Sequence, residues 1–375
     1  MFDPGIVPLP DPNPLPAPYW VFKTLLVVTF FLHILAMNFM LGGAVMALLA
    51  RWRQKSNPYG SRIFLDVAKK LPVFMAATIS LGIAPLLFVQ VLYGQYFYTS
   101  SILIAWPWFL VIAFLIAAYY GFYFVSNRGE SRPRAAGRVL LFSIALVLII
   151  GFIYTNNLTL SQVPSHWADK YFSSSASGWS LNLSEPTLFP RYLHFMTAAV
   201  AVGGLLLVLI AWTQWKQDTD YARSLFLFGG KAFMYATMAQ FAIGMGFLIS
   251  LPRELRMVFM GDNTLATALF GFGVVGSLIS IFLMSEALRK GNIRMAAFAV
   301  SGITGLIILT MCVMRDILRD AYLKPYFHPQ EFAVKTQWSP LLLFLGLFLA
   351  GVVLWFVMLK RYGLFDKEKS RGPIA

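Results

Sequence analysis

Two histidines stand inside segments whose other residues suit the interior of a lipid membrane. His33 lies in FFLHILAMNFMLGG (30–43), and His194 lies in FPRYLHFMTAAVAVGG (189–204). In both segments a leucine precedes the histidine, and a pair of glycines begins nine residues after it. A neutral imidazole among apolar neighbours is a usual axial ligand of haem iron, because it binds the metal without a counter-charge. The matched settings therefore predict that His33 and His194 each ligate the iron of a haem b, giving two haems.

A second interpretation of these histidines is structural: each ring only hydrogen-bonds to a carbonyl or hydroxyl group on a neighbouring helix. The repeated setting favours haem over this interpretation. Ala198 and Ala201 follow His194 at helical spacing, and their small side chains leave room for a flat macrocycle. The glycine pairs lie off the histidine face, so we expect them to allow close packing of helices.

The composition is that of an all-α polytopic membrane protein. The chain has 375 residues, of which 58% are hydrophobic and only 12% are charged, and its mean hydropathy is +0.69. A soluble core does not need so much apolar sequence. The single cysteine, Cys312, excludes a zinc site rich in cysteine, an iron–sulfur cluster held by this chain alone and a covalently attached c-type haem.

Apolar runs of about 20 residues, the length that crosses a bilayer, predict nine transmembrane helices. They lie near 20–50, 71–97, 101–125, 138–156, 188–215, 227–251, 264–288, 295–316 and 338–360. The proline-rich N-terminus lacks the basic region of a cleavable signal peptide, so we expect an extended lead-in.

The net charge of +14 reflects membrane topology. Most of the 30 Lys and Arg residues lie in the loops after the first, third, fifth and seventh predicted helices and in the C-terminal tail. These loops share one side, which the positive-inside rule makes cytoplasmic. We therefore expect an external N-terminus, a cytoplasmic C-terminus, a position in the bacterial inner membrane with lipid as a partner, and no nucleic-acid partner.

Short echoes indicate that the chain contains two tandem units of four helices. FMAAT (74–78) is echoed by FMYAT (233–237), and RVLLF (138–142) by RMAAF (294–298), at nearly the offset of the two histidines. We divide the chain into a lead-in (1–19), a first four-helix unit (20–156), an external loop (157–187), a second four-helix unit (188–318), an external loop (319–337), and a ninth helix with a cytoplasmic tail (338–375).

Other side chains could complete the haem sites. Met238, Met245 and Met311 are candidate second axial ligands, although methionines in membrane helices usually serve core packing. Three arginines near the outer surface could pair with haem propionates or, alternatively, with lipid phosphates: Arg191, Arg315 and Arg319. All acidic residues fall in predicted loops or within about a turn of a helix end, so a buried carboxylate pathway for protons is not expected.

The chain resembles subunit I of the cytochrome bd quinol oxidases. That family has nine helices, an external N-terminus, two four-helix units, and histidine haem ligands in its first and fifth helices, where His33 and His194 stand. YTNNLTLSQVP (154–164) is similar to the family segment A-N-x-W-M-Q-x-P-V-G, with Asn157, Gln162 and Pro164 in register. LGIAPLLFVQVLYG (81–94) resembles the segment that ends F-Q-F-G, and RDILRD (315–320) lies where the family has G-R-Q-P-W.

Three departures from this family bear on oxygen chemistry. The third predicted helix lacks the glutamates that deliver protons in the family, and Cys312 stands where the family has a glutamate ligand for a high-spin haem. The external loop where the family oxidises quinol is reduced to 252–263. The resemblance therefore implies a relative that has kept electron transfer and lost oxygen reduction.

The resulting functional hypothesis is a bd-like haem b subunit of an oxidoreductase complex. It would exchange electrons between the quinone pool and a periplasmic redox partner, such as a multihaem c-type cytochrome. Glu254, beside arginines at the outer membrane edge, would accept a proton from quinol, unless this edge is only a solvated rim. The alternatives are a terminal bd-type quinol oxidase subunit and a haem-free membrane anchor or permease.

Overall fold

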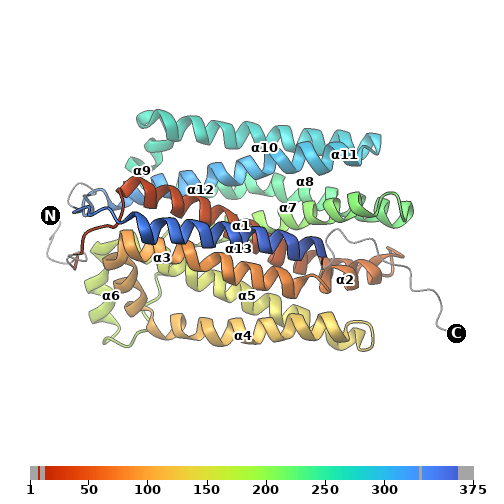
Figure 1. Ribbon diagram of the computed structural model, residues 1–375, viewed down its shortest axis with the longest axis horizontal. Coiled ribbons are helices and arrows are strands. Elements are labelled where there is room, and N and C mark those ends of the chain that lie inside the picture. Colours follow the sequence, from red (N-terminus) through yellow and green to blue (C-terminus); the bar gives the residue numbers. More distant parts are fainter. Residues whose placement is uncertain (1–6, 9–12, 329–331, 362–375) are drawn as a thin grey trace.

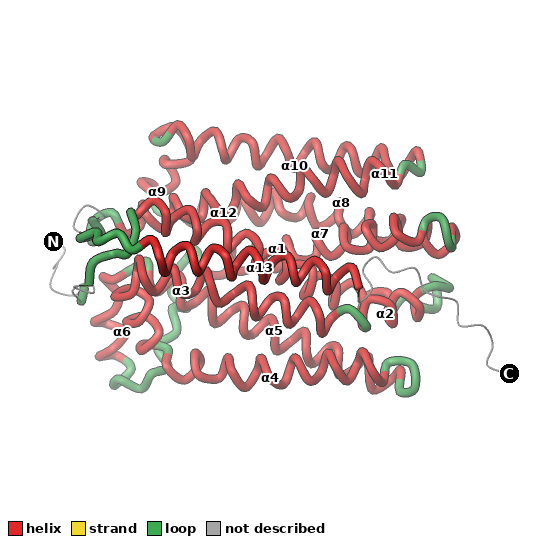
Figure 2. The backbone as a smooth tube through the Cα atoms, in the orientation of Figure 1, coloured by secondary structure: helices red, strands yellow, loops and turns green. Residues whose placement is uncertain are grey.

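The described backbone of the computed structural model consists of helices and loops (Figures 1 and 2). The structure describes residues 7–8, 13–328 and 332–361. Within these residues, nine helices are long and apolar enough to cross a membrane, which confirms the predicted all-α polytopic fold. The parts of the lead-in at 1–6 and 9–12 and the tail at 362–375 lie outside the described residues.

The first predicted unit contains four spans and one short helix. Its elements are α1 (Tyr19–Trp52), α2 (Gly60–Ala68), α3 (Leu71–Leu103), α4 (Ala105–Arg128) and α5 (Pro133–Ser161). Proline begins α5 at its first position, where no backbone N–H is needed. Within α3, the backbone of Tyr93 leaves the helical conformation eight residues after Pro85, so the helix is kinked there.

A connection with its own short helices leads to the second predicted unit. The connection holds a 3₁₀ turn, η2 (Pro164–His166), and α6 (Trp167–Ser173). The spans of the second unit are α7 (Leu188–Gln214), α8 (Thr219–Ser250), α10 (Thr264–Lys290) and the continuous run of α11 (Ile293–Met295), η4 (Ala296–Val300) and α12 (Ser301–Leu323), while α9 (Arg253–Met257) and η3 (Val258–Asp262) link α8 to α10. The last span is α13 (Trp338–Arg361).

Several helices extend beyond the ranges predicted from hydropathy. The side chain of Asp218 caps α8 by accepting a hydrogen bond from the Tyr221 backbone N–H, so α8 begins eight residues before the predicted start. The run that includes α12 ends at Leu323 and thus passes the predicted unit boundary at 318. Both helices include polar residues beyond the apolar range from which their ends were predicted. The division into two four-helix units itself stays a prediction.

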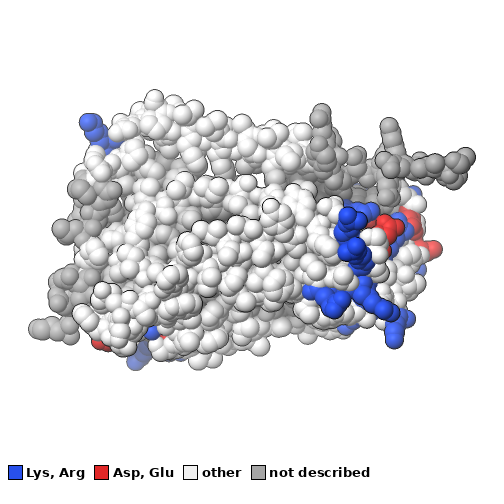
Figure 3. Space-filling model, turned by 90° about the horizontal axis from the view of Figure 1, so that it is seen from below, with Lys and Arg blue, Asp and Glu red and all other residues white. Residues whose placement is uncertain are grey.

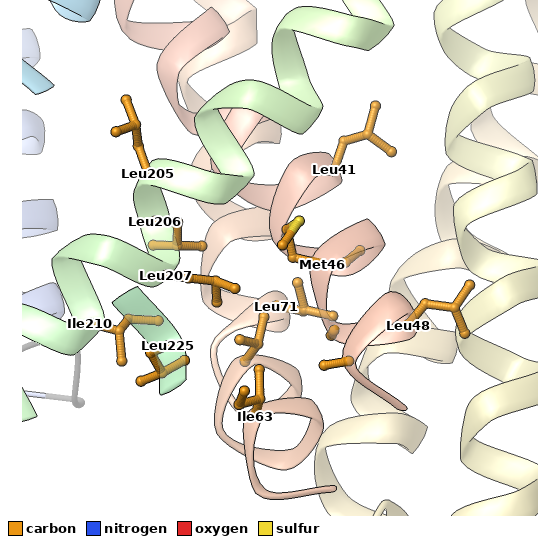
Figure 4. Close-up of a cluster of buried hydrophobic side chains, with 14 of the residues drawn as sticks. Leu41, Met46, Leu48, Ile63, Leu71, Leu205, Leu206, Leu207, Ile210 and Leu225 are labelled. Atoms are coloured by element: carbon orange, nitrogen blue, oxygen red, sulfur yellow. The ribbon is translucent and has the colours of Figure 1, made fainter. Parts of the chain in front are cut away.

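The largest core lies where α1, α2, α3, α7 and α8 meet. Figure 4 shows part of it, with Met46 of α1, Leu71 of α3 and Leu206 of α7 among the buried side chains. A second core joins the start of α1, the later half of α3 and the loop after α12. Leu15 forms backbone hydrogen bonds with Ala333 and Lys335, which fixes the end of the lead-in against this loop. We call the end of the bundle that holds α6 and α9 the outer end, and the end that holds α2 the inner end (Figure 1).

Candidate functional site

The ring of His33 lies against α3 and has one nitrogen already engaged. Its Nδ1 lies 3.0 Å from the backbone carbonyl oxygen of Thr78. Because a carbonyl oxygen only accepts, Nδ1 carries the proton and donates this hydrogen bond. The neutral ring then keeps its lone pair on Nε2, the nitrogen that is free to bind a metal. Gly82 makes room for the ring, because a Cβ there would lie 2.9 Å from His33 Nδ1.

The ring of His194 lies against α8 in a related setting. A Cβ at Gly244 would lie 3.4 Å from Cε1 of His194, so this glycine faces the ring as Gly82 faces His33. Gln240 donates a hydrogen bond of 2.9 Å to the backbone oxygen of His194. Nδ1 of His194 is buried and has no hydrogen-bond partner within the described residues. In both settings, a glycine of the following transmembrane helix faces the histidine ring. The settings differ at Nδ1, which is hydrogen-bonded in His33 and has no partner within the described residues in His194.

The helices that carry the histidines touch at the first glycine of each pair. A Cβ at Gly42 would lie 2.8 Å from the Cα of Gly203 and would overlap the backbone oxygen of Ala199. Only glycine permits this approach of α1 to α7. The expectation that the glycine pairs serve helix packing is therefore met at this crossing.

Each histidine adjoins a phenylalanine on which an arginine lies. The Phe30 ring is 6.4 Å from the His33 ring, and the guanidinium of Arg315 lies 4.2 Å from the Phe30 centroid. On the other side, the Phe247 ring is 6.4 Å from the His194 ring, and the guanidinium of Arg191 lies 5.3 Å from its centroid. A positive charge thus stands one aromatic ring away from each imidazole.

Two of the candidate arginines carry buried donors without partners. Arg191 is buried, and its Nη1 donates a 2.9 Å hydrogen bond to Gln162 Oε1. Its guanidinium also lies 5.9 Å from the centroid of the Tyr322 ring. Arg319 is buried and pairs through Nη2 with Asp316. Within the described residues, Nε and Nη2 of Arg191 and Nε and Nη1 of Arg319 have no hydrogen-bond partner. Buried guanidinium groups with unused N–H groups suit an incoming carboxylate, which accepts two such bonds at once.

An ion-pair network joins α1, α3 and α12 at the outer end. Lys23 pairs with Asp316 and, at 2.6 Å, with Asp320. The Tyr93 hydroxyl donates to Asp320 over 2.7 Å, and the Tyr19 hydroxyl lies 3.1 Å from that of Tyr93. Asp316 corrects the expectation that carboxylates stay within about a turn of helix ends, because it is buried and lies seven residues before the end of α12. A lysine and an arginine compensate its charge, which lets it lie that deep.

The candidate methionine ligands come from two helices, α8 and α12. Met238 and Met245 are 53% and 52% exposed, and at about 100° per residue they lie on a different side of α8 from Gly244. Met311 packs toward α10, because a Cβ at Gly273 would lie 2.7 Å from its methyl carbon. The roles of these three residues as second axial ligands stay predictions. Within the described residues, no three His, Cys, Asp or Glu side chains form a cluster that could hold a metal ion.

Glu254 lies in the first turn of α9 and is exposed, between Arg253 and Leu255. Phe259 of the following turn is buried in a small outer-end core with Leu251 and Leu318. The α9 region is thus attached to α12, and the Glu254 side chain is exposed on it.

The segment 154–164 has mainly structural contacts. Asn157 is buried, accepts a hydrogen bond from Ser100 and donates to Ser101, which ties α5 to α3. Gln162 orients Arg191, and Pro164 starts η2. Of these residues, Gln162 has the most direct connection to the candidate site.

Sequence reasoning missed Lys23, Gln240 and the glycines that face the rings. A signal existed for Lys23, since it is a solitary cation in the first apolar run, and Asp316 and Asp320 share a face of their helix at four-residue spacing. Gly82 and Gly244 stand at nearly the repeat offset of the histidines, so the repeat itself could have indicated them.

Comparison with known proteins confirms the fold. No family model matches this chain, and no curated protein matches it by sequence. A chain in the structure of bd oxidase from Geobacillus thermodenitrificans matches with a TM-score of 0.70 and 14% sequence identity, over 92% of this chain and 97% of that chain. The protein therefore has a bd-oxidase subunit I-like fold and is a multi-pass membrane protein.

Proposed function

We propose that this protein is a bd-like electron-transfer subunit that binds two haem b groups through His33 and His194. The observation that carries the proposal is the hydrogen bond from His33 Nδ1 to the Thr78 carbonyl, which leaves Nε2 available as a ligand. When bound, haem b supplies reversible one-electron transfer. The apolar walls around both rings would exclude water from the two sites.

The arginines of the outer end support the same proposal. Arg191 and Arg319 have buried, unpartnered N–H groups that would hold haem propionates, and Arg315 lies one turn before Arg319 in α12. These charges favour an anion at the outer ends of α7 and α12. This chemistry is independent of the iron ligands, so it forms a second line of support.

The reaction we propose is electron exchange between the quinone pool and a periplasmic redox partner, without reduction of oxygen. In the bacterial inner membrane, quinol would release two electrons and two protons, and Glu254 would accept a proton at the outer edge. A c-type cytochrome is the partner we propose, because Cys312, the single cysteine here, is buried in α12 and cannot attach haem. Four-helix units at 20–156 and 188–318 would each supply one histidine.

A second candidate function is that of a terminal bd-type quinol oxidase subunit, because the fold it shares is that of a bd oxidase chain. A spectrum of the dithionite-reduced protein with and without carbon monoxide separates the two. A shift of the Soret band indicates an open, high-spin haem and favours the oxidase. An unchanged spectrum favours electron transfer alone.

The test of the principal proposal is haem content. We expect about two haems per chain in a pyridine haemochrome assay of the purified protein, and a loss of haem in both His33→Ala and His194→Ala. His166→Ala and His328→Ala are matched controls, since both residues lie in exposed connections. Full haem content in both membrane variants would show that these histidines are not the ligands. A purified protein without a Soret band would favour the anchor or permease.

A further inference from the structure

A basic hollow of about 650 Å³ lies at the inner end, between the end of α1 and the start of α5. Figure 3 shows Lys and Arg side chains gathered at this end of the molecule, while the middle of the same face carries none. The hollow is lined by four cations, Arg51, Lys55, Arg134 and Arg138, together with Gln54, Gly137 and two apolar side chains, Trp52 and Leu141.

The described residues leave the positive charge of this hollow uncompensated. None of those that line it is a carboxylate. In the part of the chain that the structure describes, none of the four cations forms an ion pair, whereas Arg289 and Lys290 on the same end of the molecule both pair with Glu286. Four like charges around one space repel each other, and an anion in that space would remove the repulsion.

The backbone around the hollow adds to its affinity for anions. The long helix α5 begins here, and its N-cap residue Arg132 provides no side-chain cap. The N–H groups of Arg134 and Ala135, which precede the first hydrogen bond of the helix, from Ala136 to Arg132, can therefore bind an anion. Gly137 allows the Arg51 side chain to approach α5, because a Cβ there would lie 2.8 Å from Arg51 Nε. The guanidinium of Arg51 is further held over the Phe64 ring at 5.2 Å.

The apolar side chains indicate which anion fits. Trp52 is 62% exposed and Leu141 is 48% exposed, and both border the cations. Tryptophan next to Lys and Arg is typical of the level where lipid headgroups meet acyl chains. A free phosphate ion would use the cations alone, whereas a phospholipid would use the cations for its headgroup and the apolar surface for its chains.

We propose that this hollow is a binding site for an anionic phospholipid. A lipid with two phosphates, of the cardiolipin class, matches the four cations best, because basic pockets between transmembrane helices on this side bind such headgroups. Cations that only determine membrane topology would not need to line one hollow. The four cations here come from the regions of α1 and α5 and line the same hollow, which distinguishes them from such topology signals. The proposal is independent of haem binding, since none of the residues that line the hollow is a candidate for haem binding.

The test compares two variants that lose the same charge. Arg134→Gln/Arg138→Gln removes two exposed cations of the hollow, and Arg223→Gln/Arg294→Gln removes two exposed cations elsewhere on the inner end. Each purified, delipidated protein is titrated with cardiolipin, with phosphatidylglycerol and with inorganic phosphate, and bound lipid is counted by native mass spectrometry. Thermal unfolding in zwitterionic detergent without added lipid verifies that each variant is folded.

We expect the hollow variant to bind cardiolipin roughly tenfold more weakly, or worse, than both the wild type and the control variant. Phosphatidylglycerol should bind more weakly than cardiolipin, and inorganic phosphate should not compete at millimolar concentration. Equal affinity of the two variants for cardiolipin would overturn the site. Effective competition by inorganic phosphate would overturn the choice of a lipid and identify a site for free anions.

Discussion

Gly42 of α1 and Gly203 of α7 are in backbone contact, and they are the equivalent residues of the two repeated segments. The structure thus joins its two halves at matching points. A Cβ on Gly42 would overlap the Ala199 carbonyl oxygen, a clash with the backbone that no packing adjustment of side chains relieves.

We expect Gly42→Ala to lower the free energy of unfolding by roughly 1–3 kcal/mol or more, because the helices must separate. Gly246→Ala in α8 is the control, since nothing lies within 4 Å of a Cβ there. That change should raise stability by up to about 1 kcal/mol, because alanine is the better helix former. Thermal unfolding in detergent measures both, and changes of the same sign would contradict the interpretation of the crossing.

The space at Gly82 predicts a way to displace His33 without replacing it. Gly82→Val would push the ring away from the Thr78 carbonyl, so we expect up to one haem per chain to be lost. Gly94→Val in the same helix is a matched control, because a Cβ there meets only Tyr98 at an ordinary 3.5 Å. Haem content by pyridine haemochrome decides the outcome. Two full haems in the Gly82 variant would mean that the ring position has no part in haem binding.

The unpartnered donors of Arg191 predict different effects of its replacement with and without haem. In the haem-loaded protein, Arg191→Leu should speed haem dissociation roughly tenfold or more, the equivalent of one charged hydrogen bond of about 1.5–3 kcal/mol. In the haem-free protein, the same change should alter stability only slightly, because the removal of buried N–H groups without partners offsets the loss of the hydrogen bond to Gln162. Arg256→Leu on α9 serves as control. Equal effects in both forms would assign Arg191 a purely structural role.

Glu254 gives a kinetic prediction. If it accepts the quinol proton, Glu254→Gln should slow quinol oxidation by roughly 10²-fold or more while haem content stays intact. Asp262→Asn, in the same connection between α8 and α10, should leave the rate unchanged. Normal turnover of the Gln variant would place Glu254 in a solvated rim and remove it from the mechanism.

The inner end gives a pH prediction. Nη1 of Arg62 donates a hydrogen bond to Oδ2 of Asp218 over 2.5 Å. This hydrogen bond holds the pKa of the Asp218 carboxyl below its usual value. A carboxyl whose pKa is lower in the folded state contributes stability above its unfolded pKa, near 3.9, and loses it as pH falls through the folded value. Asp218→Asn keeps the helix cap and removes the charge. We expect a loss of at most about 1 kcal/mol at neutral pH, because the pair is exposed, and this difference should vanish in acid. A difference that is independent of pH would exclude the ion pair as its cause.

The sequence predicted the parts of this fold that local composition encodes. A span such as α10 is recognisable because the residues that cross a membrane are predominantly apolar, and the match to a bd oxidase chain confirms the resemblance. The correspondence of His33 and His194 could be found from the sequence, because the two repeated segments keep the same spacing between histidine and glycines. Their roles as haem ligands stay predictions.

The missed features depend on contacts that spacing does not encode. Lys23 meets Asp320 across 297 residues, and only the packing of α1 on α12 reveals the pair. The partner of His33 is a backbone oxygen, which every residue possesses, so no residue type could have marked Thr78. A choice among the candidate methionines could not be made from the sequence, because the side of a helix that faces a histidine depends on how the helices are rotated in the bundle.

The contact between Gly42 and Gly203 also places the two histidines at equal distances from the point where α1 and α7 cross. The helices α1 and α7 run in the same direction, since both end at the side where Arg62 pairs with Asp218. His33 and His194 each precede their glycine by nine residues, or about 13 Å along the helix axis. Two haems held there would lie at one level of the bilayer, and an electron passing between them would travel parallel to the membrane surface. Such a step moves no charge through the transmembrane potential, which acts only on displacement across the bilayer. Its rate would be the same in an energised and in a de-energised membrane.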